Sequence, residues 1–399
     1  MWINLDVINT FLEKAGKYLI SLLVDMGGLI AGILFSSSIA SLNKISWIIS
    51  IYPAILSMRG VISGIFSGKL STSLHLGTIY PSFRKNSEEF YHLIASIATL
   101  IFIGTIYISF ISMLYNFLVG KVFNPISLFN IIFTNMFLSF IVISPITITV
   151  AFLSYKSGLL DPDYVLYPIM STVADIIVTL IYVTSIKIPY TYTYIPIFIE
   201  FIFGAIILLI YIRYREEDMY RKMLRETILT LLIVSIIVGI TGQVLSKILT
   251  IIGYMMEIVL IYPALIDTVG DVGSIIGSIA TTRLALGTIG GKFRDIKNIV
   301  TEIMASLLAL IIMSLTYSII SQIYIGPSVG KLFKIIIVVM TGVVSAGIVM
   351  ISISYLIAIV TFRFRLDPDN FVNPIESSIA DTITTSFLAL SIILYSYLM

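Results

Sequence analysis

The sequence predicts an all-α polytopic membrane protein of about eleven transmembrane helices, arranged as two parallel five-helix repeats joined by one linking helix. The chain is 58% hydrophobic and only 12% charged, with a mean hydropathy of +1.06. Soluble domains carry about 25% charged residues. Apolar runs long enough to cross a bilayer, about 20 residues each, recur from one end of the chain to the other. Two stretches of the first half also occur again in the second half.

Each apolar run is interpreted as a helix, because a backbone exposed to lipid must satisfy its own hydrogen bonds. The predicted spans are 18–42, 47–77, 90–118, 126–154, 166–186, 192–213, 227–249, 254–287, 299–324, 333–362 and 373–398. The second and eighth spans are too long for a straight crossing and contain Pro53 and Pro263, so we expect them to tilt, kink or break. The N-terminus lacks the features of a cleaved signal peptide, and the first span is therefore expected to be retained.

Lysine and arginine in the connections predict the orientation. With the N-terminus inside, fifteen of these residues fall in inner connections and six in outer ones, and an excess of positive charge marks the cytoplasmic side. We therefore expect a multi-pass protein of the cell membrane with a cytoplasmic N-terminus. Eleven spans then place the C-terminus outside the cell.

Composition excludes several classes of function. The chain has no cysteine and only His75 and His92 as histidines, so a thiolate or multi-histidine metal site is excluded. Any metal would be held by oxygen ligands, which suit hard cations such as Mg²⁺ or Ca²⁺. The net charge of +2 does not indicate a nucleic-acid partner. No catalytic motif and no soluble domain is recognisable, and we expect that the chain is not an enzyme.

The duplication is clearest in two blocks. Residues 51–79 align without gaps to 261–289, and twelve of these 29 positions are identical. "LDPDYVLYPIMSTVAD" (160–175) returns as "LDPDNFVNPIESSIAD" (366–381). We therefore predict a first five-helix repeat over 1–189, a linking helix and cytoplasmic loop over 190–222, and a second repeat over 223–399. Because five is odd, the linking span gives both repeats the same direction, as in transporters built from parallel repeats.

Asp175 and Asp381 end the second block, each at the head of a largely apolar run. A charged side chain near the bilayer centre costs at least about 2.5–3.5 kcal/mol and indicates a functional site. Ser171 and Ser377 lie four residues earlier, on the same helix face. Each repeat thus offers a carboxylate and a hydroxyl to a hard cation, which makes these four residues candidate metal ligands.

Further candidates have weaker support from the repeat. Asp271 stands in the second repeat where the first repeat has Val61. We expect the helix that carries it to line a path for the ion, and Asp271 is therefore a fifth candidate ligand. Arg59 is expected to lie within ion-pair distance of an intramembrane carboxylate, because a buried guanidinium needs one. The remaining candidates for the pathway or for charge pairing are Asp267, Glu376, Asp163 and Asp369, the last two expected mainly as helix caps.

At these motifs the chain resembles the MgtE-type divalent-cation transporters, most closely their two-repeat members, which are related to the animal magnesium carriers. The likeness rests on Pro-Ala followed by Gly at 53–60 and 263–270, and on the Asp-Pro-Asp blocks ending in Asp175 and Asp381. It implies that these two aspartates face the pore axis and help to hold the cation. Asp271 falls where the family commonly has an asparagine. Single-repeat members build the pore as a homodimer, so one duplicated chain would supply both halves.

Together these features predict transport of divalent metal cations, Mg²⁺ in particular, through a pathway at the interface of the two repeats. The expected partners are the cations and the lipid bilayer, and no cofactor is expected beyond the transported ion. The alternative is a secondary exporter of an organic or lipid-linked substrate. Such an exporter would enclose a larger cavity with scattered polar and aromatic contacts.

Overall fold

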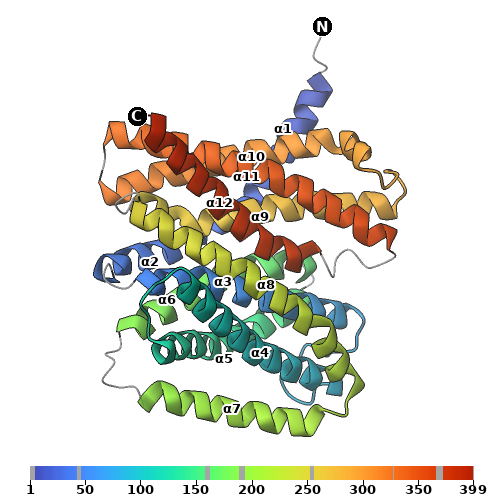
Figure 1. Cartoon of the computed structure of the whole chain (residues 1–399). Coiled ribbons are helices and arrows are strands. Elements are labelled where there is room, and N and C mark those ends of the chain that lie inside the picture. The colour runs from blue at the N-terminus through green and yellow to red at the C-terminus, as the bar shows by residue number, and fades with distance from the viewer. Residues whose placement is uncertain are drawn as a thin grey trace. The chain divides into compact units, whose positions relative to one another are not determined.

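The computed structural model describes residues 5–42, 46–157, 162–187, 194–251, 256–326, 328–364 and 372–398. These ranges are helical and contain no strand (Figure 1). The α-helices are α1 (Leu5–Leu22), α2 (Gly28–Leu42), α3 (Ser46–His75), α4 (Glu88–Leu118), α5 (Pro125–Ser157), α6 (Pro162–Lys187), α7 (Tyr194–Tyr214), α8 (Asp218–Ile251), α9 (Met256–Ala285), α10 (Val300–Ile325), α11 (Val329–Arg363) and α12 (Val372–Leu398). Two 3₁₀ segments, η1 (Leu23–Gly27) and η3 (Phe293–Ile299), precede α2 and α10.

The described part of the chain holds eleven helical segments long and apolar enough to cross a membrane, which confirms the predicted fold class. The first of them, Asn9–Ser38, consists of α1, η1 and most of α2, so this crossing is interrupted at η1. By contrast, α3 and α9 continue as single helices through Pro53 and Pro263. The break in helical structure therefore lies in the first span rather than in the two spans that contain these prolines.

The chain divides into two compact units, which we call the central unit (Ser37–Ser246) and the terminal unit (Met1–Ser36 with Lys247–Met399). The predicted repeats, 1–189 and 223–399, follow a different division. Each unit combines four helices of one predicted repeat with the first spanning helix of the other. Thus α9–α12 share a unit with α1 and the start of α2, while α3–α6 share a unit with α7 and most of α8.

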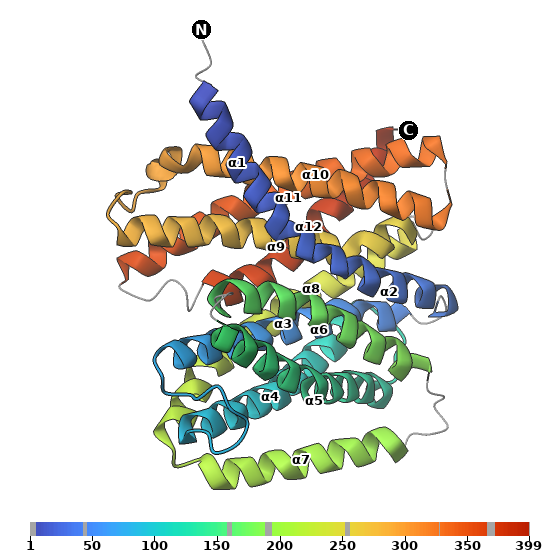
Figure 2. The same ribbon diagram turned by 180° about the vertical axis from the view of Figure 1, so that it is seen from behind.

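In the terminal unit the first span packs closely against α9 and α10. Helix α1 crosses α10 (Figure 2), and α2 meets α9 through glycines. A Cβ atom on Gly32 would lie 1.6 Å from the carbonyl oxygen of Leu260, and one on Gly28 would lie 2.8 Å from the backbone of Ala264. The two helices touch backbone to backbone, an approach that small residues permit in membrane proteins.

The central unit repeats this contact. A Cβ atom on Gly242 of α8 would lie 1.9 Å from the carbonyl oxygen of Ser50 in α3. Gly32 and Gly242 are 210 residues apart, as are Ser50 and Leu260, and this is the offset of the first duplicated block. The first spanning helix of each repeat therefore meets the second helix of the other repeat at the same position.

The linking helix α7 lies at the edge of the central unit, against α4 and α5 (Figure 1). Phe203 makes edge contacts with Phe102 and Phe133 and a tilted contact with Phe137 of these helices. Only 11% of its most apolar stretch is buried. Most of α7 is thus left for contact with lipid.

Candidate functional site

A buried hydroxyl pair joins the second and last helices of each repeat. The Tyr52 hydroxyl of α3 bonds to the Thr179 hydroxyl of α6 at 2.8 Å, and the Tyr262 hydroxyl of α9 bonds to the Thr385 hydroxyl of α12 at 2.7 Å. All four side chains are at most 1% exposed. The tyrosines belong to the first duplicated block, and the threonines follow the second by one helical turn. The duplicated blocks therefore meet in space within each unit.

Asp175 and Asp381 lie one turn before these threonines and are buried, at 9% and 8% exposure. The Thr385 hydroxyl donates a hydrogen bond of 2.6 Å to the backbone carbonyl of Asp381. The hydroxyl pairs therefore hold each aspartate-bearing turn against the helix that carries the Ile-Tyr-Pro-Ala motif.

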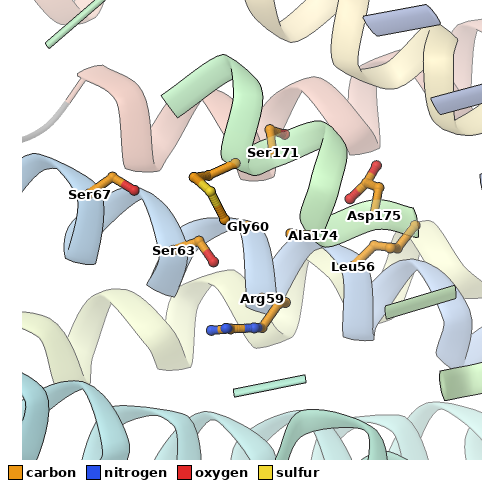
Figure 3. Close-up of a pocket in the computed structure, with 9 residues that line it drawn as sticks. Leu56, Arg59, Gly60, Ser63, Ser67, Ser171, Ala174 and Asp175 are labelled. Carbon is orange, nitrogen blue, oxygen red and sulfur yellow. The ribbon is translucent and has the colours of Figure 1, made fainter. Parts of the chain in front are cut away.

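In the central unit, α3 and α6 enclose a small cavity of about 10 Å³ beside Asp175 (Figure 3). Gly60, Ser63 and Ser67 succeed one another along α3, and Ser171 and Asp175 face the cavity from α6. The structure thus confirms that Ser171 and Asp175 share a helix face, and it places both at a cavity that polar and apolar side chains line together.

Ser63 and Ser67 were not among the predicted site residues. Their side chains are buried, and their hydroxyl oxygens have no hydrogen-bond partner within the described structure. Buried hydroxyls normally have a partner, so these two are suited to bind a water molecule or an ion. The repeat could not reveal them, because glycines 273 and 277 occupy the equivalent positions. Their positions four and eight residues after Arg59, on the same face of one helix, were the available signal.

Among the side chains that the structure describes, Arg59 finds no carboxylate for the ion pair that we expected. Its side chain is 2% exposed, Nη2 donates to the Ser139 carbonyl of α5 at 3.5 Å, and Nε has no partner in the described part of the chain. No carboxylate of the described residues forms a salt bridge with it. Although both Arg59 and Asp175 line the cavity, their charged groups point away from one another (Figure 3). The prediction was wrong because residue 59 leaves α3 toward α5, whereas Asp175 approaches from α6.

The terminal unit brings Asp271 to a carboxyl group that we had not proposed as a ligand. The carboxyl groups of Asp271 and Asp25 lie close enough to interact with each other. Asp25, Asp267 and Asp271 all lie within electrostatic range of the Tyr317 hydroxyl. That hydroxyl also bonds to Thr268 at 3.0 Å. Asp25 belongs to η1, and the interruption of the first span places this carboxyl beside α9.

Asp271 also lies beside the crossing of α9 and α12. A Cβ atom on Gly270 would make ordinary contact, at 3.5 Å, with that of Ala380, the residue before Asp381. The equivalent residues of the first repeat, Gly60 and Ala174, both line the cavity of the central unit. The crossing of the second and last helices is therefore common to both repeats.

The remaining candidates lie beyond what the structure describes. Asp163, Glu376 and Ser377 fall within helices, but the structure does not describe their side chains. Asp369 lies outside the described residues altogether. Among all the residues that the structure describes, no three histidine, aspartate or glutamate side chains lie close enough together to hold a metal ion. Direct coordination by several carboxylates is thus not a feature of this part of the chain.

Eleven spans, an internal repeat and a buried aspartate in the last helix of each repeat define a polytopic membrane protein of the transporter class. A family model described as MgtE, divalent cation transporter, matches residues 52–185 and 262–391. These segments make up well over half of the chain. The chain therefore belongs to this family. No curated protein and no solved structure matches the chain.

Proposed function

We propose that the chain transports Mg²⁺ through a pathway lined by the duplicated aspartates Asp175 and Asp381. The observation that supports this proposal is the pairing of Tyr52 with Thr179 and of Tyr262 with Thr385. In both repeats it fixes the aspartate-bearing turn against the same motif of the second helix. Two carboxylates held alike in two repeats are expected if both serve one ion.

The chemistry of the central unit suits a partly hydrated hard cation. Mg²⁺ is usually held by one or two carboxylates and keeps several water molecules. Asp175 supplies a carboxylate, and Ser63, Ser67 and Ser171 supply oxygen atoms that can accept hydrogen bonds from retained waters. A site of this kind needs no cluster of three acidic side chains.

In the second repeat the proposal gives Asp271 a supporting role. Its neighbour Gly270 lies at the crossing of α9 and α12, next to the turn that bears Asp381. Asp271 therefore adds negative charge to the second repeat, whereas its counterpart in the first repeat is Val61. Asp267 lies one turn earlier and extends this charge along α9.

The alternative, export of an organic or lipid-linked substrate, has less support. The cavity beside Asp175 has a volume of about 10 Å³, which is close to the space that one water molecule occupies. A cavity of this size holds a water molecule beside the carboxylate, and it is too small for an organic substrate. The family to which the chain belongs is defined by cation transport and not by catalysis, so the proposal includes no enzymatic step.

Flux measurements on purified protein in liposomes test the proposal. Mg²⁺ entry is followed with a trapped indicator, with each other divalent cation tested alone under the same gradient. Asp175→Asn and Asp381→Asn keep size and hydrogen bonding but remove charge, and each should abolish or sharply reduce Mg²⁺ flux. Ser171→Ala should have a smaller effect, because water can replace a hydroxyl near a hydrated ion.

Asp218→Asn is the matched control, since it makes the same change at an exposed acid. It should leave flux unchanged. Wild-type flux in correctly folded Asp175→Asn and Asp381→Asn proteins would show that these aspartates have a structural role. An absence of divalent-cation flux through the wild-type protein would instead favour the exporter.

A further inference from the structure

A second pocket, which shares no lining residue with the cavity beside Asp175, lies where α5 ends. The loop between α3 and α4 contributes Phe83 and Arg84, and α5 contributes Thr149, Phe152, Leu153 and Lys156. The pocket encloses about 380 Å³ within the central unit. It is much larger than the cavity beside Asp175, and the proposed function makes no use of it.

The loop wall of this pocket is held by its own hydrogen bonds. The Asn86 side chain accepts from the Tyr80 amide at 2.9 Å and donates to the carbonyls of Tyr80 and Ser82 at 2.7 Å. Ser82 and Arg84 exchange a second pair of bonds. On the other side, Phe83 makes an edge contact with Phe152 of α5, with ring centroids 5.3 Å apart. The pocket is therefore preformed.

Its lining combines positive charge with apolar surface. Arg84 and Lys156 are exposed, and within the described residues no acidic side chain forms a salt bridge with either. Phe83 and Leu153 are 53% and 62% exposed. Lys156 is the last residue of the membrane-crossing segment Pro125–Lys156. A cation at the end of a span is expected near the lipid headgroups, and the apolar wall of the pocket belongs in part to the span itself.

The second repeat carries the same loop residues in a different setting. Phe83 and Arg84 recur as Phe293 and Arg294. In the second repeat, α11 places the buried Tyr355 beside this loop. Its ring lies against Phe293, with centroids 5.9 Å apart, and its hydroxyl donates to the Lys292 carbonyl at 3.4 Å. The loop of the second repeat thus packs on a tyrosine of α11, whereas the loop of the first repeat packs on Phe152 of α5 and leaves the pocket beside it.

We propose that this pocket binds an anionic phospholipid, with the phosphate held by Arg84 and Lys156 and an acyl chain lying along Phe83 and Leu153. Basic pockets beside transmembrane helices recognise acidic headgroups in this way, and hydrogen bonds between charged donors and phosphate oxygens are strong. A phospholipid would use both the cations and the apolar wall of the pocket. A free phosphate would use the cations alone.

Native mass spectrometry of the full-length protein with phosphatidylglycerol and phosphatidylcholine tests this proposal. The double variant Arg84→Gln/Lys156→Gln should bind phosphatidylglycerol about 25-fold more weakly, since each basic residue contributes about fivefold. Thr149→Tyr keeps both charges but adds a bulky ring to the wall of the pocket, and it should cause a similar loss. Arg294→Gln/Lys297→Gln removes two exposed cations from the second repeat and should change binding less than twofold.

Melting temperatures close to that of the wild type establish that the variants are folded, and Thr149→Ser provides a milder change at the same position that should retain binding. The proposal is overturned if phosphatidylglycerol binding is unaffected by both pocket variants. It is equally overturned if phosphatidylcholine binds as tightly, or if millimolar inorganic phosphate displaces the lipid completely, which would identify a free-anion site.

Discussion

Tyr52 of α3 and Thr179 of α6 share a hydrogen bond of 2.8 Å that is closed to solvent, and Tyr262 and Thr385 form its counterpart. The two bonds differ in one respect. The Thr385 hydroxyl already donates to the Asp381 carbonyl, so Tyr262 must be the donor of the second bond. The Thr179 hydroxyl, by contrast, has its recorded hydrogen bond with Tyr52, and within the described residues no bond from it to the backbone is recorded.

This difference predicts unequal effects of removing the tyrosine hydroxyls. Tyr52→Phe leaves the buried Thr179 hydroxyl without a partner, which costs about 1–3 kcal/mol. Tyr262→Phe should cost less, because Thr385 keeps its bond to the backbone. Melting temperatures in detergent compare the two variants, with Tyr211→Phe as the control at a half-exposed position. Equal shifts for both variants would contradict the assigned donors.

The glycine contacts predict that the first span of each repeat tolerates no side chain at the crossing. Gly32→Ala and Gly242→Ala would place a Cβ atom 1.6 Å and 1.9 Å from a backbone oxygen, so the helices must separate. We expect losses at or above the upper end of the range of about 1–3 kcal/mol seen for overpacking.

Gly204→Ala is the control for these variants, because it also lies within a helix but has no atom within 4 Å of the added Cβ. Its melting temperature should stay the same or rise slightly. If the melting temperatures of Gly32→Ala and Gly242→Ala match that of Gly204→Ala, the first spanning helix of each repeat does not pack against the second helix of the other repeat.

Glu302 predicts a third difference in stability. This buried carboxylate of α10 accepts from Lys14 of α1 at 2.8 Å and also from Arg283 of α9. Glu302→Gln should cost about 2 kcal/mol, less than the loss of a fully buried pair, because Lys14 and Arg283 are about one-third exposed. Glu13→Gln breaks the exposed pair with Lys17 and should leave the melting temperature unchanged. If Glu302→Gln leaves the melting temperature unchanged, these charges do not hold the three helices together.

The orientation predicted from positive charge can be tested directly, since the native chain has no cysteine. Glu216→Cys and Ser328→Cys place single thiols in exposed connections on opposite predicted sides. In intact cells, a membrane-impermeant maleimide should label Ser328→Cys, whereas Glu216→Cys should react only after permeabilisation. The reverse pattern would place the N-terminus outside.

Much of the architecture follows from local properties of the chain. Hydropathy located the eleven spans because each crossing needs its own run of apolar residues, whatever its neighbours are. The repeat located Asp175 and Asp381 because duplicated residues can be compared position by position within one sequence. The same comparison indicated Asp271 and Val61 as the point where the two halves differ.

Other features depend on which helices pack together, and hydropathy contains no information about that choice. The first span could pack with its own repeat or with the other, and the backbone contact of Gly32 with Leu260 resolved this for the terminal unit. Asp25 meets Asp271 only because that packing brings η1 to α9. Arg59 was expected to pair with an acid because burial of a charge demands compensation, yet its direction from α3 led it to the Ser139 carbonyl. Side-chain direction and helix pairing arise from packing between segments remote in sequence, so they could be seen only after the chain had folded.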